Sequence, residues 1–61
     1  MIVNFITVYF KDSSRKPVQG FYKNFDFFEG FLRINTIGEK QVLYINKEEI
    51  LSFVLTYKDS N

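Results

Sequence analysis

The residues best placed to do chemistry are an aromatic ring, an amide and an ammonium group: Phe28, Asn46 and Lys47. A phenylalanine ring can stack on a nucleic-acid base, and stacking contributes about 1–3 kcal/mol per base with little regard to sequence. The Asn46 amide would then contact a base edge and Lys47 a phosphate. These three types of side chain together predict a binding site for single-stranded RNA or DNA. The alternative is that Phe28 packs in the core or an interface while Asn46-Lys47 caps a turn.

No set of side chains predicts catalysis. Asp26 with Glu29, and Glu48 with Glu49, are pairs of carboxylates, but neither pair has a recognisable partner for acid/base work. The chain contains no histidine and no cysteine, so it lacks the commonest general base, thiolate chemistry and the usual transition-metal ligands. A phosphate-binding glycine loop and a nucleophile–base pair are also missing from the sequence. We therefore expect a protein that is not an enzyme and that uses neither a metal nor a cofactor.

Positive charge gathers in one polar turn, at Lys11, Arg15 and Lys16, which would either meet phosphates or form an ordinary exposed loop. Arg33 and Lys23 stand alone along their strands. Eight Lys and Arg oppose seven Asp and Glu, for a net charge of +1. That balance is far from the basic excess of non-specific nucleic-acid binders, and it favours a protein partner.

Apolar segments of strand length alternate with turn residues along the chain. Strands are predicted at 2–10, 18–28, 31–37 and 41–46 because β-branched and aromatic residues dominate them. Gly20 inside the second strand marks a bend or bulge. Phe28-Glu29-Gly30 would either continue that strand around a corner or form a turn, and Gly38 is suited to a hairpin turn with positive φ.

The last segment permits two interpretations. Asn46 and Glu49 resemble a capping box, and apolar residues at helical spacing follow it. However, every second residue from Leu51 to Tyr57 is apolar, as in a strand. We predict a strand entered through one short helical turn at 47–49. The predicted fold is all-β: a single domain, residues 1–61, of five strands in a small, strongly bent barrel.

The aromatic content predicts a partner surface. Eight Phe and four Tyr are too many rings for the interior of a 61-residue chain, because a domain of this size buries only about 60% of its unfolded surface. Because the chain has no disulfides, we expect a homo-oligomer or an obligate partner to supply the additional stability that so small a fold needs. The N-terminal residues lack the features of a signal peptide, and no apolar run approaches the roughly 20 residues that span a bilayer. We therefore expect a cytoplasmic protein with no membrane association.

Part of this pattern resembles the bacterial Sm/Lsm/Hfq family of small β-barrels. The family shows a strand ending in a Lys-Asp turn, then a glycine, a hydrophobic residue at +2, an aromatic at +5 and an aspartate at +6. A second motif sets two isoleucines on either side of a short turn. The matching residues are Phe10-Lys11-Asp12, Gly20, Tyr22, Phe25, Asp26 and the segment Ile45 to Ile50, so the likeness covers about residues 6–55.

The resemblance implies an Sm-like or SH3-like barrel that assembles into a ring and binds RNA. It also implies that Asp26 accepts hydrogen bonds from nearby backbone amides, whereas otherwise Asp26 is a turn-forming residue. The chain departs from the family where the ligand is read: the uridine-binding asparagine falls on Gly30, and an Arg-Gly pair falls on Asn46-Lys47. The segment 2–10, a strand, also takes the place of an N-terminal helix. Barrel and ring assembly are therefore better supported than RNA binding.

The predicted function is a non-enzymatic binding module, an Sm-like oligomer with single-stranded RNA or DNA as the leading ligand. Phe28, Asn46, Lys47 and Asp26 are its predicted contact residues. The alternative is a protein–protein adaptor or assembly subunit, of the type carried by phages or mobile elements, with no nucleic-acid ligand.

Overall fold

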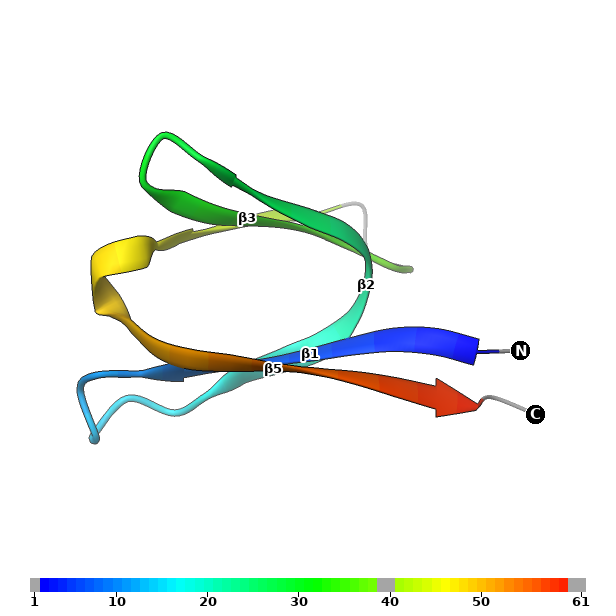
Figure 1. The fold of residues 1–61 in the computed structure, drawn as a ribbon, viewed down its shortest axis with the longest axis horizontal. Helices are drawn as coiled ribbons and strands as arrows, with labels where there is room; N and C mark the ends of the chain where they lie inside the picture. Colours follow the sequence, from blue (N-terminus) through cyan, green and yellow to red (C-terminus); the bar gives the residue numbers. More distant parts are fainter. Residues whose placement is uncertain (1, 39–40, 60–61) are drawn as a thin grey trace.

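The computed structural model describes residues 2–38 and 41–59, which form one five-stranded antiparallel sheet (Figure 1). In chain order the elements are β1 (Ile2–Phe10), β2 (Val18–Phe28), β3 (Phe31–Thr36), β4 (Val42–Asn46), the 3₁₀ turn η1 (Lys47–Glu49) and β5 (Ile50–Asp59). The predicted all-β class, the five strands and the short helical turn at 47–49 are confirmed. No helix within the described residues is long and apolar enough to cross a membrane.

The sheet is strongly curled but open. Its strand order is β4-β3-β2-β1-β5, so β4 and β5 are the two edges. No strand pairing joins β4 to β5 within the described residues, and η1 connects them at one end of the curl (Figure 1). The predicted curvature is therefore present, whereas closure into a barrel is not seen in the chain by itself.

The curl arises in β2, which belongs to both halves of the sheet. Its first part, Val18–Phe21, pairs with β1, and its second part, from Tyr22 to Phe28, pairs with β3. The register shifts between Tyr22 and Asn24, where β2 carries an extra residue relative to β3. Such a bulge bends a strand and increases its twist. β2 therefore turns from one layer into the other, just after Gly20 (Figure 1).

The core lies on the concave side of the curl, where every strand contributes apolar residues. Val8 and Leu32 are completely buried, and Ile34 is 1% exposed. Because side chains alternate along a strand, their neighbours in sequence face outwards. The buried set is Ile6, Val8, Phe10, Tyr22, Leu32, Ile34 and Ile45, with Val18, Phe25, Leu43, Ile50 and Phe53 packed against it.

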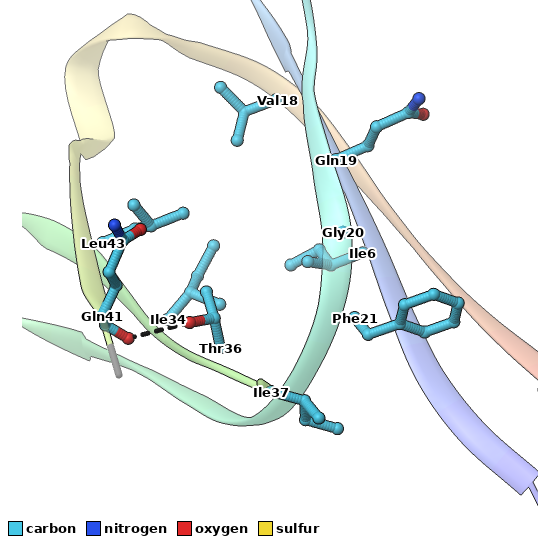
Figure 2. Close-up of a pocket in the computed structure, with 10 residues that line it drawn as sticks. All are labelled: Ile6, Val18, Gln19, Gly20, Phe21, Ile34, Thr36, Ile37, Gln41 and Leu43. Carbon is cyan, nitrogen blue, oxygen red and sulfur yellow. Dashed lines mark hydrogen bonds between the residues drawn. The ribbon is translucent and has the colours of Figure 1, made fainter. Parts of the chain in front are cut away.

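At one end of this core a cavity opens to the surface. A cavity of about 290 Å³ lies between the β1–β2 half and the β3–β4 half of the sheet. Ile6 and Val18 reach it from one side, and Ile34 and Leu43 from the other, while Gln19 and Phe21 point away (Figure 2).

The turns follow local sequence. Glu29 and Gly30 have φ values of 48° and 82° and join Phe28 to Phe31 directly. A two-residue hairpin with both central φ values positive is a type I′ turn, so this segment is a turn and β2 ends at Phe28. Gly38 has φ 86°, as its place in the sequence predicts. Asn46 caps η1 by accepting a hydrogen bond from the Glu48 N–H at 2.9 Å.

Candidate functional site on the outer face of the sheet

The convex side of β2, β3 and β4 carries a mixture of aromatic, amide and charged side chains. Leu32, Ile34 and Ile45 are buried, so the residues between them on β3 and β4 face outwards. Directly paired residues share a face, and the pairings Asp26–Arg33 and Arg33–Tyr44 extend that surface across three strands. We call it the outer face: Asn24, Asp26, Phe28, Phe31, Arg33, Asn35, Val42, Tyr44 and Asn46.

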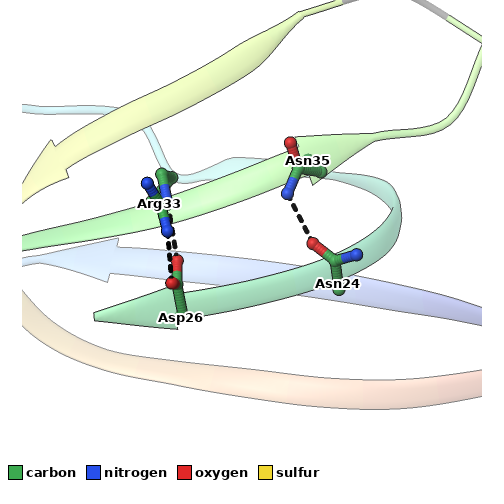
Figure 3. A network of polar contacts seen from close by, with 4 residues as sticks. All are labelled: Asn24, Asp26, Arg33 and Asn35. Atoms are coloured by element: carbon green, nitrogen blue, oxygen red, sulfur yellow. Dashed lines mark hydrogen bonds and ion pairs between the residues drawn. The ribbon is translucent and has the colours of Figure 1, made fainter. Parts of the chain in front are cut away.

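Arg33 is held at the centre of the outer face by Asp26. Its Nε and one terminal nitrogen donate to the two carboxylate oxygens at 2.8 and 2.5 Å (Figure 3). This forked geometry fixes the plane of the guanidinium as well as its charge. The hydrogen bond from Arg33 lowers the pKa of Asp26, and hydrogen bonds to Asp26 and then to Tyr44 raise the pKa of Arg33. Both groups are therefore charged across the physiological range.

Three exposed rings surround this ion pair. The Arg33 guanidinium carbon lies 4.5 Å from the centroid of the Phe28 ring, a cation–π distance. Phe31 and Tyr44 meet edge to face, with centroids 6.2 Å apart and planes at 87°. Phe28, Phe31 and Tyr44 remain 43%, 39% and 55% exposed. The rings are thus fixed in orientation by their neighbours while their surfaces stay open to a ligand.

Polar groups flank the rings along the strands. On one side the Asn35 amide donates to the Asn24 side-chain oxygen (Figure 3), with exposed Lys23 next to it in β2. On the other side Asn46 lies opposite Phe31 across the β3–β4 pairing. Lys47 follows Asn46, is exposed, and donates its backbone N–H to the Gly30 carbonyl oxygen at 2.9 Å. A lysine therefore stands at each end of the aromatic region.

The structure brings three of the four sequence-predicted residues onto this face. Phe28 is outside the core, so the packing alternative for it within the single chain is wrong. Asp26 pairs with Arg33, whereas the Sm-like resemblance implied that it would accept from backbone amides. Asn46 caps η1, as the simpler alternative predicted, and still lies at the end of the outer face. Lys47 adjoins the face through η1.

Sequence reasoning missed Arg33, Phe31 and Tyr44. Arg33 stands alone along β3, but the two-residue turn at Glu29-Gly30 places it opposite Asp26. A type I′ turn at Glu29-Gly30 pairs Phe28 with Phe31, and counting two residues outwards on each strand then pairs Asp26 with Arg33. The sequence signal for this pairing is therefore the two-residue turn. Tyr44 needs in addition the register of β3 with β4, where the intervening turn includes residues outside those described.

The basic turn is engaged within the chain. Arg15 pairs with Glu49, and its guanidinium carbon lies 3.8 Å from the centroid of the Phe10 ring. Asp12 accepts hydrogen bonds from the Ser14 hydroxyl and backbone N–H at 2.7 and 3.0 Å, and these lower the pKa of its carboxyl group. These contacts hold the β1–β2 loop against η1, which supports the ordinary-loop interpretation of the cluster.

Metal-ligating side chains do not gather at one place in the described part of the chain. It contains no group of three or more acidic, histidine or cysteine residues that could hold a metal ion. The comparisons with protein-family models, with curated proteins and with solved structures find no match. The interpretation of the outer face therefore depends on its own geometry.

Proposed function

We propose that the protein is a non-enzymatic binding module whose outer face takes single-stranded RNA or DNA. The observation that carries this proposal is the group of exposed rings, Phe28, Phe31 and Tyr44, arranged around an arginine that Asp26 holds in place. Bases can stack on such rings, and each stacked base contributes about 1–3 kcal/mol. Asn46 and the Asn24–Asn35 pair supply amide groups beside the rings for contacts to base edges.

Phosphate contacts in this arrangement are few. Asp26 neutralises Arg33, so Lys23 and Lys47 are the cations that flank the rings. A single strand lying along β2 and across to η1 would place its backbone near both lysines. Because each phosphate contact on a single strand contributes about −0.7 to the slope of log K against log salt, we expect a slope of about −1.4. Affinity would then come mainly from stacking.

The test is fluorescence anisotropy of labelled ten-nucleotide oligo-dT and oligo-U titrated with the protein. Phe28→Ala and Tyr44→Ala are expected to weaken binding about fivefold to a hundredfold, the equivalent of about 1–3 kcal/mol per stacked base, with thermal unfolding nearly unchanged. Tyr9→Ala is the matched control, because Tyr9 is 41% exposed and lies on β1, away from the outer face and from both edge strands.

Two outcomes would contradict the nucleic-acid proposal. One is the absence of binding below about 100 μM at physiological salt, the weak end of non-specific affinity. The other is equal weakening of binding by Tyr9→Ala and Tyr44→Ala, which would mean that the effect is not specific to the outer face. Either result would transfer the proposal to the protein–protein adaptor or assembly subunit, which the net charge of +1 already favours.

Assembly is proposed through the sheet edges. β5 has ten residues and exposes Leu51, Val54, Leu55 and Tyr57, and β4 exposes Val42 and Tyr44. An open edge with apolar side chains is a template for pairing with another chain. A second copy could therefore supply the closure that one chain lacks, as an Sm-like or SH3-like oligomer would. Such an assembly, without cysteine, suits a cytoplasmic protein.

Solution mass by light scattering, measured across a range of concentrations, tests the assembly. We expect a closed oligomer, and Leu51→Lys should convert it to monomer because Leu51 is 67% exposed on β5. Leu51→Ala controls for loss of the side chain without added charge. A monomeric wild-type protein, or an oligomer unaffected by Leu51→Lys, would rule out this edge.

A further inference from the structure

The cavity in the bend of β2 extends from the apolar core to the surface of the protein. Two of its lining residues, Ile6 and Ile34, belong to the buried core at 4% and 1% exposure. Other lining residues are open to solvent: Ile37 is 42% exposed and Gln41 is exposed as well. The space of about 290 Å³ between β1–β2 and β3–β4 is therefore an apolar pocket that a small molecule can reach from outside.

Gly20 is the residue that leaves this space open. It lies opposite Ile6 in the β1–β2 pairing, on the concave side of β2. A Cβ atom built at Gly20 would meet no atom within 4 Å, and its φ does not lie in the left-handed region. Neither sterics nor backbone geometry requires glycine at this position, although glycine in a strand lowers stability. A larger apolar residue would fill the hollow.

The lining indicates what could enter. Ile6, Val18, Ile34 and Leu43 supply an aliphatic wall, and none of the lining residues is charged. Transfer of a charge into such a space is strongly unfavourable. Polar groups occur on one side, where the Thr36 hydroxyl donates to the Gln41 carbonyl oxygen at 3.0 Å and the Gln41 side chain is exposed (Figure 2).

The volume sets the size of the guest. An apolar cavity of about 150 Å³ holds one benzene ring, and this one is about 290 Å³. We propose that the cavity is a binding site for a small uncharged aromatic molecule of bicyclic size, with one N–H or hydroxyl group directed at Gln41. The site lies on the concave side of the sheet and is distinct from the outer face.

Indole is a suitable probe, and methyl-resolved NMR is the direct test on the unaltered protein. At about 1 mM indole, a concentration that half-fills a site of millimolar affinity, the methyl signals of Ile6, Ile34 and Leu43 should shift. Intermolecular nuclear Overhauser effects should connect indole protons to the same methyl groups. An absence of shifts, or shifts confined to the ring signals of Phe28, Phe31 and Tyr44, would overturn the proposal.

Gly20→Val is the variant expected to lose indole binding. Its side chain should occupy the hollow, abolish the indole-induced shifts and raise the melting temperature. Ser52→Val controls for the gain in strand propensity, because Ser52 is exposed on β5 and is not one of the lining residues. Unchanged indole shifts in Gly20→Val would overturn the proposal. If Gly20→Val does not fold, Gly20→Ala adds a single methyl group, and retained full affinity in that variant would count against the site.

Discussion

At the scale of single residues, Arg33 determines the character of the outer face. A free guanidinium would make this surface basic, but the forked ion pair with Asp26 makes it nearly neutral while keeping the cation above the Phe28 ring. The planarity of the pair suits stacking more than it suits capture of a phosphate. Under the proposed function, selectivity for nucleic acid would therefore depend on the geometry of the rings.

The lowered pKa of Asp26 predicts a pH dependence of stability. Its folded-state pKa lies below the ordinary 3.8 because Arg33 donates to the carboxylate, so the stabilisation is present above the unfolded-state value and is lost as pH falls through the folded one. We expect Asp26→Asn to lower the melting temperature at pH 7 and to converge with wild type near pH 2. Thermal unfolding followed by circular dichroism from pH 7 to pH 2 measures this.

Asp12 provides the comparison for this pH series. Its pKa is also lowered, mainly by the hydrogen bonds from Ser14. The melting temperatures of Asp12→Asn and wild type should therefore also converge at low pH, while the oligonucleotide affinity stays unchanged. A gap between Asp26→Asn and wild type that stays constant down to pH 2 would mean that the ion pair does not stabilise the fold.

At the scale of elements, the β2–β3 turn contains the one residue in an unfavourable conformation among the non-glycine residues described. Glu29 has φ 48°, which costs an L-residue roughly 1–2 kcal/mol. Asn-Gly is the preferred pair for a type I′ turn. Glu29→Asn should therefore stabilise the protein by about 0.5–1 kcal/mol, measured by urea unfolding.

The adjacent glycine gives the opposite expectation. Gly30 has φ 82°, so Gly30→Ala should destabilise by about 1 kcal/mol or more. If Glu29→Asn destabilised the protein, the turn would not have the type I′ geometry, and the Asp26–Arg33 register would need to be reconsidered.

Strand bounds could be predicted closely from the sequence, and the reason is local. Alternation and β-branched content place the ends of β3 and β4 within one residue of those observed, at Thr36 and Val42. The sequence leaves β5 ambiguous because the apolar residues of 50–57 fit both the helical and the strand periodicity. Pairing with β1, from Ile2–Asp59 to Phe10–Ile50, decides in favour of the strand. That pairing joins distant segments, so no local pattern could show it.

At the scale of the whole molecule, the open sheet is the feature that sequence could not predict. The sheet closes into a barrel only if β4 pairs with β5, either of the same chain or of another copy. The residues of these two strands do not determine how far apart the strands lie. The same holds for the candidate site: Phe28, Asn46 and Lys47 were predictable by type, whereas Arg33 and Tyr44 required the register of three strands.

The size of the core predicts how little damage the fold tolerates. Leu32 is completely buried, and replacing it with alanine should cost about 2–5 kcal/mol. A 61-residue domain has only about 3–9 kcal/mol to lose. We expect Leu32→Ala to be largely unfolded at 37 °C by circular dichroism, whereas Leu51→Ala, at an exposed position, should keep its secondary structure. If the Leu32→Ala protein were well folded, contacts outside this core, most directly those between subunits of an assembly, would have to stabilise the fold.

The pairing of β1 with β5 also has a consequence for synthesis on the ribosome. Ile2 pairs with Asp59, so β1 is synthesised well before the strand that pairs with it. Until β5 leaves the exit tunnel, one edge of β1 has no strand to pair with. The β1–β5 pairing must therefore wait until the residues up to Asp59 have emerged, and such long-range pairings form slowly. During that interval the unpaired edge of β1 is a template on which another chain can pair.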